Sequence, residues 1–242
     1  MSGSMTDIAV LRILVFLCII GAFFLTWIFT PLSKTVARRI GAIDVPQDGR
    51  RMHKTPVPRF GGLAIFLSTA VFILLIRFVL FPQTFLAHER GEPTNQLLAV
   101  LVGGAVIFAA GAVDDVRPMR ARTKLFCQIV CGIVTFLLGI RIDNIAGLHL
   151  FISDSTVGGY ILSLLLTVVW VVAIINTINL IDGMDGLAAG VSGIASLSIA
   201  YAGYIHGQYV VTLLMCAVAG AALGFLPSNF FPAKVIMGDC GA

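Results

Sequence analysis

Charged residues are scarce in this sequence. Only 12% of its 242 residues are charged, whereas 58% are hydrophobic. Soluble domains carry about 25% charged residues, so the composition excludes an ordinary soluble domain. The chain has only 12 acidic residues and 4 histidines. Its chemistry must therefore depend on a small set of polar side chains.

Cysteines are also few, and they give no disulfide framework. Four of the five lie inside apolar blocks, and Cys127 and Cys131 are one helical turn apart. A metal-binding pair is one interpretation of that spacing. We expect small, buried packing residues instead.

Long apolar runs make up most of the chain. About 20 apolar residues span a bilayer as a helix, and seven blocks approach or exceed that length. They cover residues 8–32, 60–81, 96–113, 125–140, 159–180, 186–204 and 209–226. Membrane β-strands would be about ten residues long and alternating, which these blocks are not. We predict an all-α, polytopic membrane bundle of about seven transmembrane helices.

The first block is too long for a signal peptide and lacks a small-residue cleavage site, so we expect a retained helix. Residues 1–5 resemble a cloning scar ahead of a native Met5. Residues 6–242 then form one integral-membrane domain.

Lys and Arg gather between particular blocks. The segments after the first, third and seventh blocks hold 12 of the 16 basic residues. Because basic loops remain on the cytoplasmic side, we expect a multi-pass protein of the inner (plasma) membrane with its N-terminus outside. The segments after the odd-numbered blocks then face the cytoplasm. The net charge of +4 reflects this topology and contact with anionic membrane lipid, so no nucleic-acid partner is expected.

Two adjacent carboxylates end the third block. Asp114 and Asp115 repel each other and resist burial beside an apolar helix. A divalent cation or a cationic substrate would relieve both costs. A solvated helix end is the alternative interpretation.

A second polar group follows the fifth block, with members at every third position: Asn176, Asn179, Asp182 and Asp185. Steps of three drift around an α-helix, so the four cannot form one face. The two Asp-Gly pairs indicate a turn. We therefore predict that the asparagines end one helix and that the aspartates lie in a break, where Asp185 caps the next helix. Broken backbone at membrane depth is tolerated where it lines a cavity.

The remaining polar signals are weaker alone. Asp239 lies in a Gly-Asp-Cys-Gly turn, where the backbone can approach a ligand closely. His53, Lys54 and Arg59 lie in a loop whose cations suit phosphate groups. Hard oxygen donors with few histidines suit Mg²⁺ or Mn²⁺ better than zinc. The residues alone thus predict metal-assisted phosphoryl chemistry at the cytoplasmic surface.

Four motifs together resemble the polyprenyl-phosphate N-acetylhexosamine-1-phosphate transferases (the glycosyltransferase 4 family). They are HKTPVPRFGG at 53–62, GAVDDV at 111–116, NTINLIDGMDGLAAG at 176–190 and MGDCGA at 237–242, in the family's order. The resemblance implies transfer of a sugar 1-phosphate from a UDP-N-acetylhexosamine to undecaprenyl phosphate, release of UMP and a need for Mg²⁺, with Mn²⁺ as an alternative.

The PVPRFGG element is similar to the UDP-GlcNAc branch, which starts teichoic acid, O-antigen, lipopolysaccharide or other surface glycans. The phospho-MurNAc-pentapeptide transferases of peptidoglycan synthesis are the alternative. Direct attack by the lipid phosphate is the expected route, and a covalent intermediate on an aspartate stays open.

The resemblance also implies roles for individual residues. Asp114 would deprotonate or orient the lipid phosphate with support from Asp115, and Asp182 and Asp185 would shape the nucleotide pocket. The candidate catalytic residues are therefore Asp114, Asp115, Asp182 and Asp185. The candidate substrate-binding residues are Asn176, Asn229, His53, Lys54, Arg59 and Lys124. The candidate metal ligands are Asp239, Asn179 and Asn176.

The chain also departs from the family pattern. The family continues beyond the Gly-Asp motif with further helices and a histidine-containing loop, whereas this sequence stops at Ala242, where Ser is frequent. We therefore expect weak or no activity from residues 1–242 alone. The rival interpretations are an ion-coupled transporter, because intramembrane acids often mark such pathways, and an inactive scaffold. A homodimer is left open.

Overall fold

The computed structural model describes residues 5–45, 56–80, 93–145, 148–149 and 157–242. Within these ranges the chain forms seven α-helices, one for each of the seven apolar blocks of the sequence. They are α1 (Met5–Ile40), α2 (Gly62–Leu75), α4 (Pro93–Val116), α5 (Ala121–Leu137), α6 (Val157–Ile181), α7 (Leu187–Ile205) and α8 (Tyr209–Asn229). A π-helical segment, η1 (Ile76–Leu80), continues α2.

Six helices in the described part of the chain are long and apolar enough to cross a membrane. The helix outside this group is α5, which has 17 residues and carries Arg122 and Lys124 in its first turn. At 1.5 Å per residue, α1 is about 54 Å long, which exceeds the roughly 30 Å of a bilayer's hydrocarbon core. Its last turn, with Arg38 and Arg39, therefore extends beyond the apolar layer.

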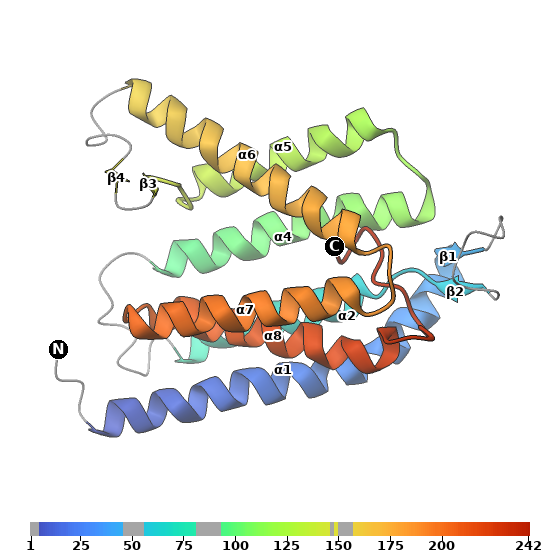
Figure 1. The fold of residues 1–242 in the computed structure, drawn as a ribbon, viewed down its shortest axis with the longest axis horizontal. Coiled ribbons are helices and arrows are strands. Elements are labelled where there is room, and N and C mark those ends of the chain that lie inside the picture. Colours follow the sequence, from blue (N-terminus) through green and yellow to red (C-terminus); the bar gives the residue numbers. More distant parts are fainter. Residues whose placement is uncertain (1–4, 46–55, 81–92, 146–147, 150–156) are drawn as a thin grey trace.

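Two small hairpins connect helices at opposite ends of the bundle (Figure 1). Strands β1 (Ile43–Asp44) and β2 (Val57–Pro58) pair antiparallel between α1 and α2. Strands β3 (Asn144–Ile145) and β4 (Leu148–His149) pair antiparallel between α5 and α6. The first hairpin fixes the chain that leads into the candidate site.

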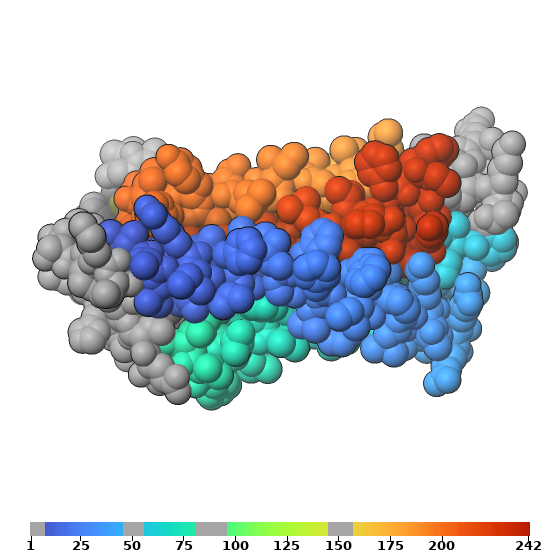
Figure 2. Space-filling model, turned by 90° about the horizontal axis from the view of Figure 1, so that it is seen from below, coloured from blue at the N-terminus to red at the C-terminus, as the bar shows by residue number. Residues whose placement is uncertain are grey.

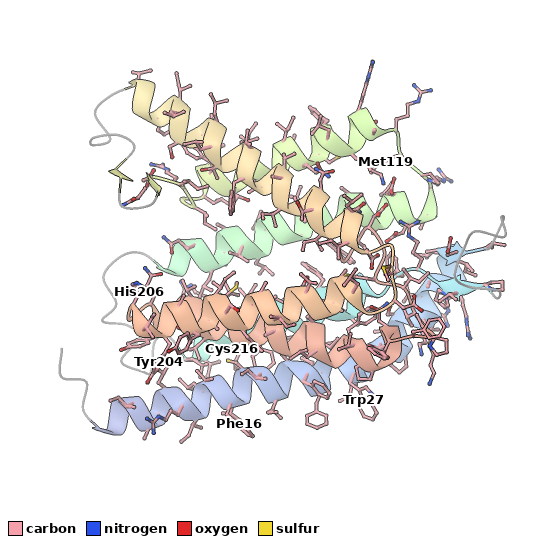
Figure 3. The ribbon with its side chains drawn as sticks, in the orientation of Figure 1. Phe16, Trp27, Met119, Tyr204, His206 and Cys216 are labelled. Carbon is pink, nitrogen blue, oxygen red and sulfur yellow. The ribbon has the colours of Figure 1, made fainter. Side chains whose placement is uncertain are left out.

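The core of the bundle surrounds α8, which is the most buried of the membrane-length helices. It packs against α1, α7 and α2, and Figure 2 shows α1 lying along both α8 and α2. A Cβ atom at Gly220 or Gly224 would overlap the backbone of α1, so glycine permits this close approach. On the outer side of α1, Phe16 and Trp27 point away from the bundle (Figure 3).

Helix α6 is packed differently. It crosses the other helices obliquely (Figure 1) and makes its main contacts with α5. Most of its apolar surface is exposed, including Leu180 at its C-terminal end. An apolar helix with this exposure faces lipid in a membrane.

The C-terminal ends of α1, α4, α6 and α8 lie at the same end of the bundle (Figure 1). This is the arrangement that the alternating topology predicted. It brings together the last turns of these helices and the segments that follow them, where most of the predicted site residues lie.

Candidate active site

The chain after α8 folds back against the start of α2. Gly61 and Gly62 donate backbone N–H bonds to the carbonyl oxygens of Ile236 and Met237, at 3.0 and 2.8 Å. Met237 is buried in a small core beside α7 and α8. These contacts fix the backbone just before Asp239.

Two carboxylates bind the backbone of the Gly-Asp turn. Asp115, whose side chain is fully buried, accepts the N–H groups of Asp239 at 2.8 Å and Cys240 at 3.0 Å. Asp182 accepts the N–H of Gly238 at 3.1 Å. Gly238 has a φ of +79°, a left-handed conformation that favours glycine. The turn is therefore held from α4 on one side and from the loop after α6 on the other.

Asp114 ends α4 beside this turn. One of its oxygens accepts the N–H of Met119 at 2.6 Å, and the other lies 2.6 Å from the Lys124 ammonium. A Cβ atom at Gly111, one turn earlier, would overlap the carbonyl group of Asp239. Glycine at this position lets the Gly-Asp turn pack directly on α4.

Asp239 is the centre of the polar cluster. Its Oδ1 accepts hydrogen bonds from Asn179 Nδ2 at 2.6 Å and from Arg59 Nη2 at 3.0 Å. Its Oδ2 lies 2.8 Å from Lys124 Nζ. The Arg59 Nε atom is also 3.2 Å from Asp115. Four segments distant in sequence thus meet at one carboxylate.

This environment shifts two carboxyl groups in opposite directions. Burial raises the pKa of Asp239, but a hydrogen bond with Asp114 and the cations Lys124 and Arg59 outweigh burial and hold that pKa below its usual range. Burial raises the pKa of Asp182 to about 7, although its hydrogen bond with the backbone favours the ionised form. Asp239 is therefore ionised at neutral pH, and Asp182 is close to its midpoint.

A pocket of about 410 Å³ opens beside Asp239. Apolar side chains of α4 and α6 form one wall. The polar wall consists of Asp114, Lys124, Gln128, Asn176, Asn179 and Asp239. The pocket therefore joins an apolar surface to a cluster of carboxylates, amides and an ammonium group.

Residues 97–242, more than half of the chain, match the model of glycosyl transferase family 4. The chain belongs to this family. Together with the six membrane-length helices, membership makes this family 4 protein an integral membrane protein.

Three curated proteins illustrate what this chain is similar to. This family 4 chain is 34% identical over 215 residues to a probable undecaprenyl-phosphate N-acetylglucosaminyl 1-phosphate transferase of Bacillus subtilis, which covers 89% of this chain and 55% of that protein. It is 37% identical over 230 residues to a decaprenyl-phosphate N-acetylglucosaminephosphotransferase of Mycobacterium tuberculosis. That match covers 90% of this chain and 54% of the Mycobacterium protein. It is 33% identical over 245 residues to a phospho-N-acetylmuramoyl-pentapeptide-transferase of a Geobacillus species. That match covers 93% of this chain and 70% of the Geobacillus protein. The chain spans about half the length of the first two relatives.

The structure of this family 4 protein separates Asn176 from Asn179, which the sequence could not do. Of these two asparagines, it is Asn179 that donates a hydrogen bond to Asp239, at 2.6 Å. The Asn176 amide donates to Gln128 at 2.7 Å and to the Val172 carbonyl at 2.8 Å. Its carboxamide oxygen accepts a hydrogen bond from Gln128 Nε2 at 3.5 Å, which leaves it one further lone pair.

Gln128 was missed by sequence reasoning. It is buried, lines the pocket and pairs with Asn176. A single glutamine within an apolar block belongs to no motif. The available signal was its polarity inside the apolar block 125–140, because a polar residue within such a block is costly to bury and often functional.

The prediction that Asp185 caps the next helix was wrong. Gly186, with a φ of +74°, occupies the N-cap position of α7 and makes no side-chain cap. The left-handed backbone places Asp185 beside the segment after α8, where it accepts the Ala233 N–H at 2.9 Å. Asn229 bridges the same two segments, accepting from Gly186 at 3.1 Å and donating to Val235 at 3.0 Å. Asp185 and Asn229 thus bind backbone groups next to the site.

His53 and Lys54 lie outside the described residues. The other two predicted cations, Arg59 and Lys124, both contact Asp239. Lys124 also lines the pocket, whereas Arg59 reaches the site through Asp239 and Asp115.

The donor set can be tested for a divalent cation. Within the described residues, no three His, Cys, Asp or Glu side chains form a metal-binding group. Two carboxylates, those of Asp114 and Asp239, do meet on one cation, the Lys124 ammonium. Mg²⁺ usually takes one or two carboxylates and completes its shell with waters and substrate phosphates. The residues present fit Mg²⁺ or Mn²⁺ bound together with a phosphorylated substrate.

Proposed function

We propose that this family 4 protein transfers a sugar 1-phosphate from a UDP-sugar to a polyprenyl phosphate such as undecaprenyl phosphate. The favoured group is GlcNAc-1-phosphate. One observation carries the proposal. The ionised Asp239 carboxylate is gathered with Asp114, Lys124 and Arg59 at the rim of a pocket whose other wall is apolar. The names of the Bacillus and Mycobacterium relatives support the same reaction for those proteins.

The bond changes are those of a phosphoryl transfer. An oxygen of the lipid phosphate attacks the phosphorus that bears the sugar, the bridging P–O bond breaks, and UMP leaves with the bond electrons. Asp114 is placed to orient the attacking phosphate or to accept its proton. Lys124 and Arg59 are placed to hold phosphate oxygens through charge-assisted hydrogen bonds.

Asp239 and Asn179 would hold Mg²⁺. The chemistry that this ion supplies when bound is charge neutralisation on the diphosphate and on the departing UMP. Asp115 and Asp182 hold the backbone of the Gly-Asp turn and thereby position Asp239. Most of the catalysis is thus positioning and electrostatics on rigid helix ends.

The apolar wall suits the lipid substrate. Ile107 and Ala110 of α4 and Ile175 of α6 line the pocket on the side that continues into the bundle. The lipid-exposed surface of α6 adjoins this wall. An isoprenoid tail can remain in the bilayer while its phosphate reaches Asp114.

We also propose that the site faces the cytoplasm from the inner (plasma) membrane. The last turn of α1, with Arg38 and Arg39, and the basic segment after α4 lie at the same end of the bundle as the pocket (Figure 1), and basic loops remain on the cytoplasmic side. The lipid-linked product would start a surface glycan such as teichoic acid, O-antigen or lipopolysaccharide. The clustering of the acids at helix ends, rather than along a path across the bilayer, favours a transferase over the rival transporter.

The donor sugar is the finer part of the proposal. The Geobacillus relative is named for phospho-MurNAc-pentapeptide transfer, which keeps that donor as the alternative. A direct test uses membranes that contain the protein at its natural length. Radiolabelled UDP-GlcNAc and undecaprenyl phosphate are added to these membranes. A labelled lipid together with UMP supports the proposal. A labelled lipid only from UDP-MurNAc-pentapeptide would select the alternative, and no product from either donor would refute the function.

A further inference from the structure

The Lys124 ammonium lies between the carboxyl groups of Asp114 and Asp239, and Asp239 is a proposed ligand of the divalent cation. Its Nζ atom is 2.6 Å from Asp114 Oδ2 and 2.8 Å from Asp239 Oδ2. Lys124 lies in the first turn of α5. One side chain from a separate helix thus bridges the end of α4 and the Gly-Asp turn.

The other oxygen of each carboxylate is already bound elsewhere. Asp114 Oδ1 accepts the Met119 N–H, and Asp239 Oδ1 accepts bonds from Arg59 and Asn179. The two Oδ2 atoms therefore form the inner, cation-binding side of the pair. A divalent ion held by Asp239 would compete with the Lys124 ammonium for this side of the carboxylate. Because two cations in contact repel strongly, both cannot occupy this position.

We propose that Lys124 is a built-in substitute for the divalent cation. In the absence of a metal ion its ammonium neutralises the Asp114–Asp239 pair, and metal binding displaces it into the pocket. The displaced ammonium then faces the phosphate groups of the nucleotide, and Asp114 Oδ2 becomes open to the lipid phosphate. This last part depends on the proposed function, whereas the exchange of cations does not.

The side chain and its surroundings permit this exchange. A lysine ammonium is a compact charge on a flexible stem with rotatable donors. The Lys124 side chain is 35% exposed and lines the pocket of about 410 Å³. It can therefore leave the carboxylates without movement of α5.

The exchange can be measured as Mn²⁺ binding to the purified protein by electron paramagnetic resonance, with no substrate present. Lys124→Met should bind Mn²⁺ at least about ten-fold more tightly than the wild type, because the competing cation is gone. Arg59→Met is the matched control, since Arg59 also contacts Asp239 but on the other oxygen. It removes one positive charge without vacating the bridging position, so we expect less than about a three-fold change. Equal effects of the two variants, or no tighter binding by Lys124→Met, would overturn the proposal.

A second measurement uses the wild-type chain and so does not depend on the folding of a variant. Lysine acylation is followed by mass spectrometry with and without Mn²⁺, and the exposed Lys234 serves as the internal reference. Labelling of Lys124 relative to Lys234 should increase when Mn²⁺ is added. Unchanged or decreased labelling would contradict displacement.

The two proposals can fail separately. If cation exchange is seen but no lipid product forms from either UDP-sugar, the transferase function fails and the role of Lys124 stands. If product forms while Mn²⁺ affinity and labelling do not respond as expected, Lys124 is a permanent part of the site and only this inference fails.

Discussion

Asp239 differs from the other aspartates of the site in what its side chain contacts. Asp115, Asp182 and Asp185 accept backbone N–H groups. The Asp239 carboxylate instead meets side chains from three other segments. At the residue scale, the aspartates therefore divide into those that shape the turn and the pair, Asp114 and Asp239, that lines the pocket.

Asp239→Asn should lower UMP release at least about 100-fold, because a charge positioned for the reaction is lost. The matched control is Asp143→Asn. Asp143 is an exposed aspartate that accepts a hydrogen bond from Ser163 of α6 and directly precedes β3, and β3 lies at the other end of the bundle (Figure 1). The control should retain activity within about two-fold. Comparable activity of the two variants in membranes would contradict the role of Asp239.

Asp182 gives a prediction about pH. Burial raises its pKa to about 7, whereas an unfolded aspartate titrates near 3.9. The folded state thus binds the proton more tightly, so this group's contribution to stability is complete below about pH 4 and is lost as the pH rises toward 7. Asp182→Asn, which can still accept the Gly238 N–H, should gain thermal stability relative to wild type as the pH increases over this window. Thermal unfolding in detergent at pH 5, 6, 7 and 8 measures the difference, and a constant difference would disprove the assignment.

At the scale of elements, the site depends on how closely the Gly-Asp turn approaches α4. Gly111 faces the backbone of Asp239, and any added side chain would push the turn away. Gly104, two turns earlier on the same helix, has only an ordinary contact distance of 3.7 Å from Phe66 for an added Cβ atom. Substitutions at these two glycines therefore distinguish a general effect on helix α4 from a specific effect on the site.

Gly111→Ala should lower UMP release by about ten-fold or more, because displacements of about 1 Å in a positioned site are costly. Gly104→Ala should leave activity unchanged and can stabilise the helix slightly. Both rates are measured in the same membranes after the amounts of protein are matched. Equal activity of the two variants would mean that the turn can adjust without loss.

For the whole molecule, the alternating helices place the pocket and the β3–β4 hairpin at opposite ends of the bundle (Figure 1). Met119 and His206 mark the two ends of the bundle in Figure 3. Thr123 and His206 are exposed near these ends, and each can be replaced by cysteine for labelling.

In intact cells, a membrane-impermeant maleimide should label His206→Cys and should label Thr123→Cys only after permeabilisation. The unsubstituted protein gives the background, since four of its five cysteines are buried. The opposite labelling pattern would place the pocket outside the cytoplasm. The proposal that the protein uses a UDP-sugar would then have to be abandoned.

The sequence by itself determined the membrane class, the places of the helical segments and the break after Asn179. These features are local, because apolar length sets a membrane helix and adjacent Asp-Gly pairs set a turn. The motifs also indicated the set of aspartates and asparagines. The wrong prediction, Asp185 as a helix cap, came from local spacing at a position where a distant segment competes for the carboxylate.

Only the tertiary structure decided which oxygen meets which partner. Asp115 and Asp239 are 124 residues apart, and Lys124 and Asp239 are 115 apart, so no spacing rule could connect them. The assignment of Asn179 to Asp239, the pairing of Asn176 with Gln128 and the bridging position of Lys124 all follow from the packing of α4, α5 and α6 around one turn. Short-range patterns encode elements, but hydrogen bonds between elements exist only after the helices have packed.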